Sequence, residues 1–331
     1  MASSSNKKLS ILYVLRILEK YSDENHLLTQ EDIVQKIYSI YGMECERKSV
    51  GASLDSLEAL GYDIAKVPRR GCYLGERMFE DSEVSYLIDS LFSSKVIPSS
   101  MARTLAEKVA SKLSIYQTKR FKYIYKADDI SRSDNRQVFY TVDIINQAIE
   151  QGKKIRFKYN KYVQNNQMKE RKEGKFYTVN PYFMVNSQGK YYLVCNYEHF
   201  DTLANYRIEF ITEIEILEQG IKPITSLKGC EGGVDIAKYV NENIYMFGGE
   251  HIEATLKLEN ENAVSYVADW FGKNARFFQK DGELYAEAKT NEMALVYWAL
   301  QYGESVEVIE PLQTREKIKE IISKMANKYR K

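Results

Sequence analysis

The segment Lys153–Tyr159, with the sequence KKIRFKY, decides the fold of the middle of this chain. Ile155, Phe157 and Tyr159 alternate with basic residues, and a β-strand directs successive side chains to opposite faces. This strand is therefore predicted to have one apolar face and one cationic face. Further strands are predicted at 176–185, 190–197 and 205–217.

Basic residues continue beyond this first strand. Between positions 153 and 177, nine lysines and arginines stand against two acidic residues, Glu170 and Glu173. Tyr162, Phe176 and Tyr177 are interleaved with them. The simplest interpretation is a small β-module with a basic, aromatic-lined surface, which favours an anionic ligand.

The 331 residues allow roughly two to four domains. The net charge of +1 is uninformative, but residues 101–172 carry seventeen lysines and arginines against seven acidic residues, which indicates an anionic partner. The four cysteines have no C-x-x-C spacing, so we expect free thiols in a reducing compartment. No signal peptide or membrane span is visible, and we expect a cytoplasmic protein without a membrane partner.

The N-terminal part has the pattern of a winged helix-turn-helix. Apolar residues at helical spacing predict three helices, the second capped by Thr29 and the third beginning near Arg47. Two short strands at 62–64 and 72–74 flank a loop with the sequence PRRG. A helix of this kind fits the major groove of DNA, and a basic wing contacts phosphates.

Double-stranded DNA is therefore an expected partner of this region. The third helix is expected to present Arg47, Lys48, Ser49 and Ser53 outward, and the wing contributes Lys66, Arg69 and Arg70. The alternative is a winged helix used only for protein contacts, with the arginines as solvated surface charges.

Four regions are predicted along the chain. Residues 1–75 form the winged helix, and 76–136 form a helical linker or dimerisation segment that ends in a polar stretch from Asp128 to Arg136. Residues 137–225 form the β-module. From Gly248 onward the order βαββαβ, with an Asp281-Gly282 turn and one extra helix, predicts a ferredoxin-like fold within residues 226–331.

No catalytic chemistry is visible in the sequence. Phosphate-binding glycine loops, H-E-x-x-H and G-x-S-x-G are missing, and the three histidines, His26, His199 and His251, fall in three different predicted regions. We therefore expect a protein that is not an enzyme and that has no cofactor or metal.

The chain resembles WYL-domain transcriptional regulators over nearly its whole length. Their Trp-Tyr-Leu signature reads Tyr191-Tyr192-Leu193 here, preceded by 155–159 and by Val179-Asn180-Pro181-Tyr182. The segment 206–211, YRIEFI, is similar to the Phe-Arg-x-Asp-Arg-Ile segment of the family, with Phe210 in place of the second arginine. Residues 236–240 and 246–250 are similar to the entry of the C-terminal extension called WCX.

The resemblance implies an α+β multidomain protein: a winged helix-turn-helix, a helical linker, an Sm-like β-barrel WYL domain and a ferredoxin-like WCX domain. It also implies that the WYL domain binds a nucleic acid or nucleotide. The expected ligand-binding residues are Tyr192 and Arg207, with Arg156, Lys158, Arg171 and Tyr182 nearby. The alternatives are a structural strand tyrosine at 192 and an ion pair of Arg207 with Glu209.

Three hypotheses of function follow. The first is a homodimeric, ligand-responsive DNA-binding transcription regulator. The second is an accessory protein that binds single-stranded nucleic acid and modulates an RNA-guided or phage-defence effector. The third, an enzyme, would need a cleft of perturbed titratable groups.

Overall fold

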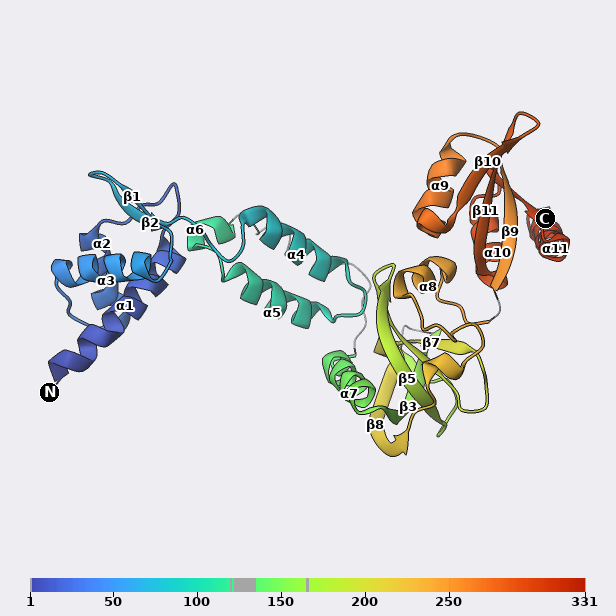
Figure 1. Cartoon of the computed structure of the whole chain (residues 1–331), viewed down its shortest axis with the longest axis horizontal. Helices are drawn as coiled ribbons and strands as arrows, with labels where there is room; N and C mark the ends of the chain where they lie inside the picture. The colour runs from blue at the N-terminus through green and yellow to red at the C-terminus, as the bar shows by residue number, and fades with distance from the viewer. Residues whose placement is uncertain (1, 120, 122–134, 165–166, 250, 331) are drawn as a thin grey trace. The chain divides into compact units, whose positions relative to one another are not determined.

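The computed structural model describes residues 2–119, 121, 135–164, 167–249 and 251–330, with side chains from Leu9 onward (Figure 1). The chain divides into two compact units, Met1–Asp134 and Asn135–Lys331. Most of the polar stretch predicted from Asp128 to Arg136 lies outside the described residues.

Unit 1 begins with three helices and a hairpin, in the order that the sequence predicts. They are α1 (Ala2–Tyr21), α2 (Gln30–Tyr41), α3 (Arg47–Ala59), β1 (Ile64–Val67) and β2 (Gly71–Leu74). Thr29 caps α2 in a reciprocal arrangement with Asp32, which satisfies two helix-terminal N–H groups. The apolar stripes of the three helices meet in one core that includes Ile17, Ile33 and Leu57.

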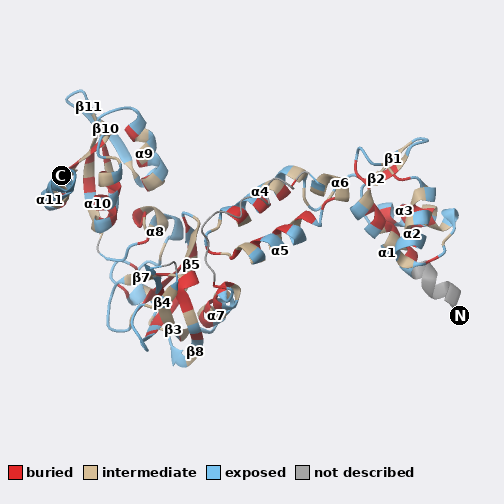
Figure 2. Cartoon of the chain, turned by 180° about the vertical axis from the view of Figure 1, so that it is seen from behind, coloured by how far each residue is buried: buried red, intermediate tan, exposed pale blue. Residues whose placement is uncertain are grey.

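A second helical part follows in unit 1 and has its own core. It consists of α4 (Asp81–Ser93), α5 (Ser99–Ala110) and the short α6 (Ile115–Thr118). Buried residues, red in Figure 2, lie on the sides of α4 and α5 that pack together. Ile88 and Phe92 of α4 pack there with small α5 residues such as Ala106, which confirms the helical prediction for this region.

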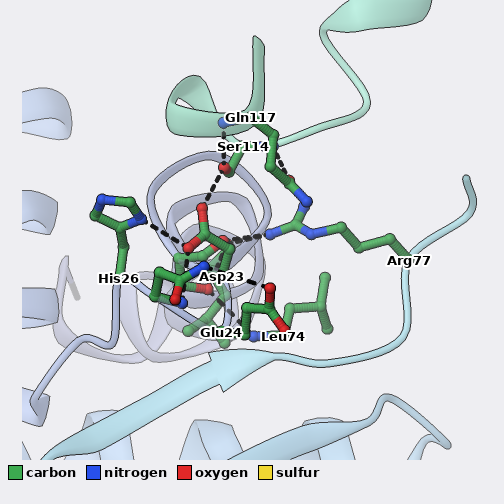
Figure 3. A network of polar contacts seen from close by, with 10 residues as sticks. Asp23, Glu24, His26, Leu74, Arg77, Ser114 and Gln117 are labelled. Carbon is green, nitrogen blue, oxygen red and sulfur yellow. Dashed lines mark hydrogen bonds and ion pairs between the residues drawn. The ribbon is translucent and has the colours of Figure 1, made fainter. Parts of the chain in front are cut away.

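Asp23 connects these two parts of unit 1 (Figure 3). Its Oδ2 accepts a hydrogen bond of 2.7 Å from Ser114 Oγ, and its Oδ1 lies 2.7 Å from His26 Nδ1. Arg77 donates to main-chain carbonyls at the end of α1, including that of Glu19 at 2.7 Å. Segments before α2, after β2 and at the start of α6 are thus joined by polar contacts.

Unit 2 begins with a helix packed on a six-stranded antiparallel sheet. The elements are α7 (Val138–Gln151), β3 (Lys153–Tyr162), β4 (Met168–Glu170), β5 (Phe176–Ser187), β6 (Lys190–Asn196), β7 (Leu203–Arg207) and β8 (Ile211–Gly220). The strand order is β4-β3-β5-β6-β7, and β8 also pairs with β3. Ile155 and Phe157 of β3 are fully buried, as the alternation predicts.

Two expectations for this sheet are corrected. The strand expected at 205–217 is two strands, because the 3-10 turn Ile208–Phe210 separates β7 from β8. The side-chain amide of Asn135 donates to the carbonyls of Glu209 and Ile211, and Asn160 donates to that of Phe210, which fixes the turn. The expected closed barrel is also wrong, because within the described residues the sheet is open.

The C-terminal part of unit 2 has the predicted order βαββαβ with one extra helix. After the 3-10 turn Ile224–Ser226 and α8 (Ile236–Glu242) come β9 (His251–Leu258), α9 (Asn262–Phe271), the 3-10 turn Gly272–Asn274, β10 (Arg276–Lys280), β11 (Glu283–Asn291), α10 (Glu292–Gln301), β12 (Val306–Glu310) and α11 (Leu312–Lys328). The antiparallel sheet has the order β10-β11-β9-β12, and the core contains Trp298 and Phe271.

Candidate nucleic-acid interface and ligand site

The first turn of α3 presents basic side chains to solvent. Val50, Leu54 and Leu57 are buried in the core of unit 1, so the helical period leaves Arg47 and Lys48 exposed. Arg47 Nε donates to Gln30 Oε1 of α2 over 3.1 Å, which orients its guanidinium. Ser49 is half-buried beside them.

Ser53 does not lie on this exposed surface, and the expectation for it is corrected. Its side chain is only 7% exposed. Ser53 Oγ donates to the carbonyl of Ser49 over 2.9 Å and lies 3.1 Å from Ser10 Oγ of α1. Ser53 lies three residues after Val50 and four before Leu57, so it shares their buried face of α3. Its hydroxyl therefore contacts α1.

Lys66 of the hairpin is bound to two carboxylates of α3. Its Nζ lies 2.7 Å from Glu58 Oε2 and 3.1 Å from Asp55 Oδ1. The hydrogen bonds with Glu58 and Asp55 raise the pKa of Lys66. These two carboxylates compensate the charge of Lys66, and the ion pairs hold the hairpin against α3.

The tip of the hairpin presents Arg69 and Arg70, both exposed. The N–H of Arg70 donates to the carbonyl of Val67 over 3.0 Å, and Arg69 has a φ of 61°. This left-handed conformation is unfavourable for a residue with a side chain. Gly71 follows with a φ of 125°, and a Cβ there would lie 2.5 Å from the carbonyl oxygen of Leu28.

The cationic face of β3 is neutralised by acidic residues. Arg156 contacts Glu215 of β8, and Lys158 Nζ lies 2.8 Å from Glu213 and 3.0 Å from Glu170. The remaining pairs on this strand are Lys153 with Glu218 and Lys154 with Glu198. Four of the nine basic residues counted between 153 and 177 are therefore charge-compensated, all of them on β3.

Tyr192 and Arg207 are directly paired across β6 and β7. The guanidinium of Arg207 binds Glu209: Nε donates to Oε1 over 2.8 Å, and Nη2 contacts the same oxygen. The guanidinium also lies over the ring of Phe210, 4.3 Å from its centroid. The ion pair that the sequence left open as an alternative for Arg207 is thus present.

A cluster of tyrosines surrounds this pair. The main-chain N–H of Arg207 donates to Tyr159 Oη over 3.2 Å, and the ring of Tyr159 packs edge-to-face on Tyr206 and Phe210. Burial raises the pKa of Tyr159 to about 12, and it also raises the pKa of Tyr192. These hydroxyls are therefore neutral hydrogen-bonding groups at physiological pH.

The other expected ligand residues are divided between different places. Arg171 is exposed, and its main-chain N–H donates to Tyr159 O over 2.8 Å, which brings it to the tyrosine cluster. Arg156 and Lys158 alternate with Phe157 along β3 and so face the opposite side of the strand. Tyr182 Oη donates to Lys222 O over 2.9 Å, a structural contact.

The sequence reasoning missed the acidic partners of these cations. Glu213 and Glu215 alternate with apolar residues along β8, as the basic residues do along β3. This complementary alternation is the feature of the sequence that indicates ion pairs between the two strands. The register that brings Arg156 opposite Glu215 joins positions far apart in the sequence, and the local pattern does not define it.

Several kinds of site are missing from the part of the chain that the structure describes. No group of three or more histidine, cysteine or acidic side chains there could hold a metal ion. All four cysteines are free thiols, as expected. None of the described helices combines the length and apolarity required to span a bilayer.

Comparisons with known proteins agree with this architecture. Residues 140–216 match the family model of the WYL domain, and residues 250–326 match that of the WCX domain. The chain thus contains a WYL domain. It carries the WCX domain after the WYL domain, as the resemblance implied.

Similar solved structures are distant. Proteasome accessory factor B/C (PafBC) of Arthrobacter aurescens has 18% identity and a TM-score of 0.31, and the match covers 97% of this chain and 48% of that chain. This chain thus spans about half the length of PafBC. A CRISPR Cas-related protein has 16% identity and a TM-score of 0.40, with 99% and 85% covered. No curated protein matches the chain.

Proposed function

We propose that this chain is a ligand-responsive transcription regulator that binds double-stranded DNA as a homodimer. In this proposal residues 1–75 act as a winged helix-turn-helix and 76–136 as a linker. Residues 137–225 sense a nucleotide or nucleic-acid ligand, and 226–331 form the C-terminal extension. The presence of WYL and WCX domains supports an assignment to regulation.

The proposal of DNA binding rests on the location of the positive charges in unit 1 that no carboxylate compensates. Arg47, Lys48, Arg69 and Arg70 are exposed and have no ion-pair partner within the described part of unit 1. They lie on a helix start and on a hairpin tip, the two elements that a winged helix directs at a duplex. Guanidinium and ammonium groups there would bind phosphates or the acceptor edge of guanine.

The hairpin is held in place for such a role. Lys66 connects β1 to α3 through Asp55 and Glu58, and Leu28 pairs with Cys72 of β2 through two main-chain hydrogen bonds of 2.9 and 2.8 Å. A wing fixed to the recognition helix presents its arginines in a defined position. Pre-organisation of this kind lowers the entropic cost of binding.

The ligand-sensing part is supported by the group formed by Tyr192, Arg207 and Tyr159. Aromatic rings stack on nucleobases, and a guanidinium binds phosphate. The alternative, an accessory protein whose β-module is the principal binder of single strands, receives less support. Four cations of β3, at positions 153, 154, 156 and 158, are already paired with carboxylates.

Selection from randomised duplex and single-stranded DNA pools tests the proposal. A dimeric winged-helix regulator should enrich a duplex with two inverted half-sites, spaced by about one helical turn or a multiple of it. Enrichment of single strands without any duplex motif would contradict the proposal and favour the accessory protein.

A further inference from the structure

Arg207 is occupied by a carboxylate of its own chain. Nε and Nη2 of its guanidinium both contact one oxygen, Oε1 of Glu209. The side chain of Glu209 is 0% exposed, whereas that of Arg207 is 27% exposed. The guanidinium is therefore paired on its inner side and remains accessible from solvent.

The second carboxylate oxygen of Glu209 does not take part in the ion pair with Arg207. Oε2 is buried and has no hydrogen-bond partner among the described residues. An unsatisfied buried acceptor is costly, and it persists only where the surrounding structure holds it. That support is visible: the amides of Asn135 and Asn160 bind the main-chain carbonyls of Glu209 and Phe210.

Aromatic side chains lie next to this pair. Phe210 lies under the guanidinium of Arg207, and Tyr192 is its cross-strand neighbour. A ligand that reaches Arg207 would meet the exposed ring of Tyr162, which packs edge-to-face on Phe210, and a cation whose charge Glu209 already compensates. An anionic group alone would gain little there, because a close negative charge opposes it.

We propose that Glu209 is a specificity-determining residue of the ligand site, an internal counter-ion that competes with the ligand's anionic group for Arg207. This inference rests on the proposed ligand-sensing function. It restricts the ligand class to molecules that combine an anionic group with a stacking ring, such as a nucleotide or a single strand. Inorganic phosphate, which cannot stack, is selected against.

The test uses the full-length protein with two probes, a short labelled single-stranded DNA and inorganic phosphate. Glu209→Gln keeps the size and one acceptor of the side chain but removes its charge. We expect this variant to bind the single strand at least about tenfold more tightly, and to bind phosphate measurably. Glu218→Gln, which removes the same charge from a 93% exposed partner of Lys153, should change both affinities less than about twofold.

A double-mutant cycle separates this role from a structural one. In an Arg207→Gln background, Glu209→Gln should have no effect on single-strand affinity. The guanidinium for which Glu209 and the ligand compete is then absent. If Glu209→Gln does not fold, Glu209→Asp, whose shorter side chain weakens the pair, should still tighten binding. Unchanged or weaker single-strand binding by a folded Glu209 variant would overturn the inference.

The two proposals can fail separately. If neither the wild type nor any Glu209 variant binds either probe while duplex binding is intact, the ligand site and this inference are both wrong and the DNA-binding assignment stands. If the wild type binds the single strand and the Glu209 variants do so no better, only the role of Glu209 is wrong.

Discussion

Ser114 donates a hydrogen bond of 2.7 Å to the carboxylate of Asp23, across 91 positions of the sequence. Both side chains are buried. Ser114 also caps α6 by accepting from the N–H of Gln117. The bond therefore fixes α6 against the segment that leads into α2, within the unit proposed to bind DNA.

Replacing Ser114 by alanine should destabilise unit 1. The change removes a donor from a buried carboxylate, which costs about 1–3 kcal/mol, and it also removes a helix cap. Chemical denaturation followed by circular dichroism would measure the loss. Ser111→Ala removes a serine hydroxyl that donates to Lys108 O at an exposed position, and it should change stability by less than about 0.5 kcal/mol. Equal losses for the two variants would contradict the role of Ser114.

The carboxylate of Asp23 should also shape the acid side of the stability curve. Burial opposes ionisation, but hydrogen bonds from Ser114 and His26 outweigh it and hold the pKa of Asp23 below its usual value of 3.8. A carboxyl with a lowered folded pKa stabilises the protein above the unfolded pKa and loses this contribution as pH falls through the folded value.

Asp23→Asn should accordingly flatten the decline in stability below about pH 4. The neighbouring His26 and Arg77 remain in this variant, so the difference between the two curves reports Asp23. The free energy of unfolding is measured from pH 7 down to the acid limit for both proteins. A wild-type curve and a variant curve that stay parallel over this range would be inconsistent with the lowered pKa.

Arg69→Gly should separate stability from DNA binding at the hairpin tip. Glycine adopts the φ of 61° found at this position without strain, so stability should stay within about 1 kcal/mol of the wild type, on the stabilising side. Duplex affinity should fall, and the slope of log K against log salt should become shallower by about 0.9. A glycine variant that binds duplex DNA as tightly as the wild type would remove Arg69 from the interface.

Gly71→Ala, two residues after Arg69, should destabilise the protein. Its Cβ would lie 2.5 Å from the Leu28 carbonyl oxygen, so the hairpin must move or the variant loses stability by more than about 1 kcal/mol. Thermal unfolding of Arg69→Gly and Gly71→Ala in parallel tests both statements. A Gly71→Ala variant as stable as the wild type would show that the hairpin tolerates this contact.

Lys66 and Arg70 provide a matched pair of charge deletions on one hairpin. Lys66→Met should lower stability modestly, because Asp55 and Glu58 lose their partner, and leave the salt slope of DNA binding nearly unchanged. Arg70→Met should leave stability unchanged and reduce the slope by about 0.9. Binding titrations over a salt series distinguish the two variants. A reversed order of slopes would mean that Lys66, and not Arg70, contacts phosphate.

The sequence predicted features that depend on local patterns. Alternation along β3 placed Ile155 and Phe157 in the core, and the Asp281-Gly282 turn has positive φ at both residues, 52° and 81°, as a type I′ turn requires. Thr29 caps α2 because its side chain and that of Asp32 satisfy each other's N–H groups.

Other features depend on contacts between distant segments, and the local pattern does not define them. Ser53 occupies a polar position on a helix, and only the approach of Ser10 in α1 makes it a buried contact. The neutralisation of Arg156 and Lys158 needs β8 to pair with β3 in one register. The turn after Arg207 needs amides from Asn135 and Asn160. A charge count along the chain cannot detect such compensation.

The most direct test of the proposed function is duplex binding by a variant that neutralises Arg47, Lys48, Arg69 and Arg70 together, measured over a salt series against the wild type. A selected duplex serves as the probe, and circular dichroism verifies that the variant is folded. We predict that specific binding is lost and that the salt slope falls by about 3 to 4, because each removed phosphate contact contributes about 0.9. A folded variant that binds the duplex with unchanged affinity and slope would contradict the account.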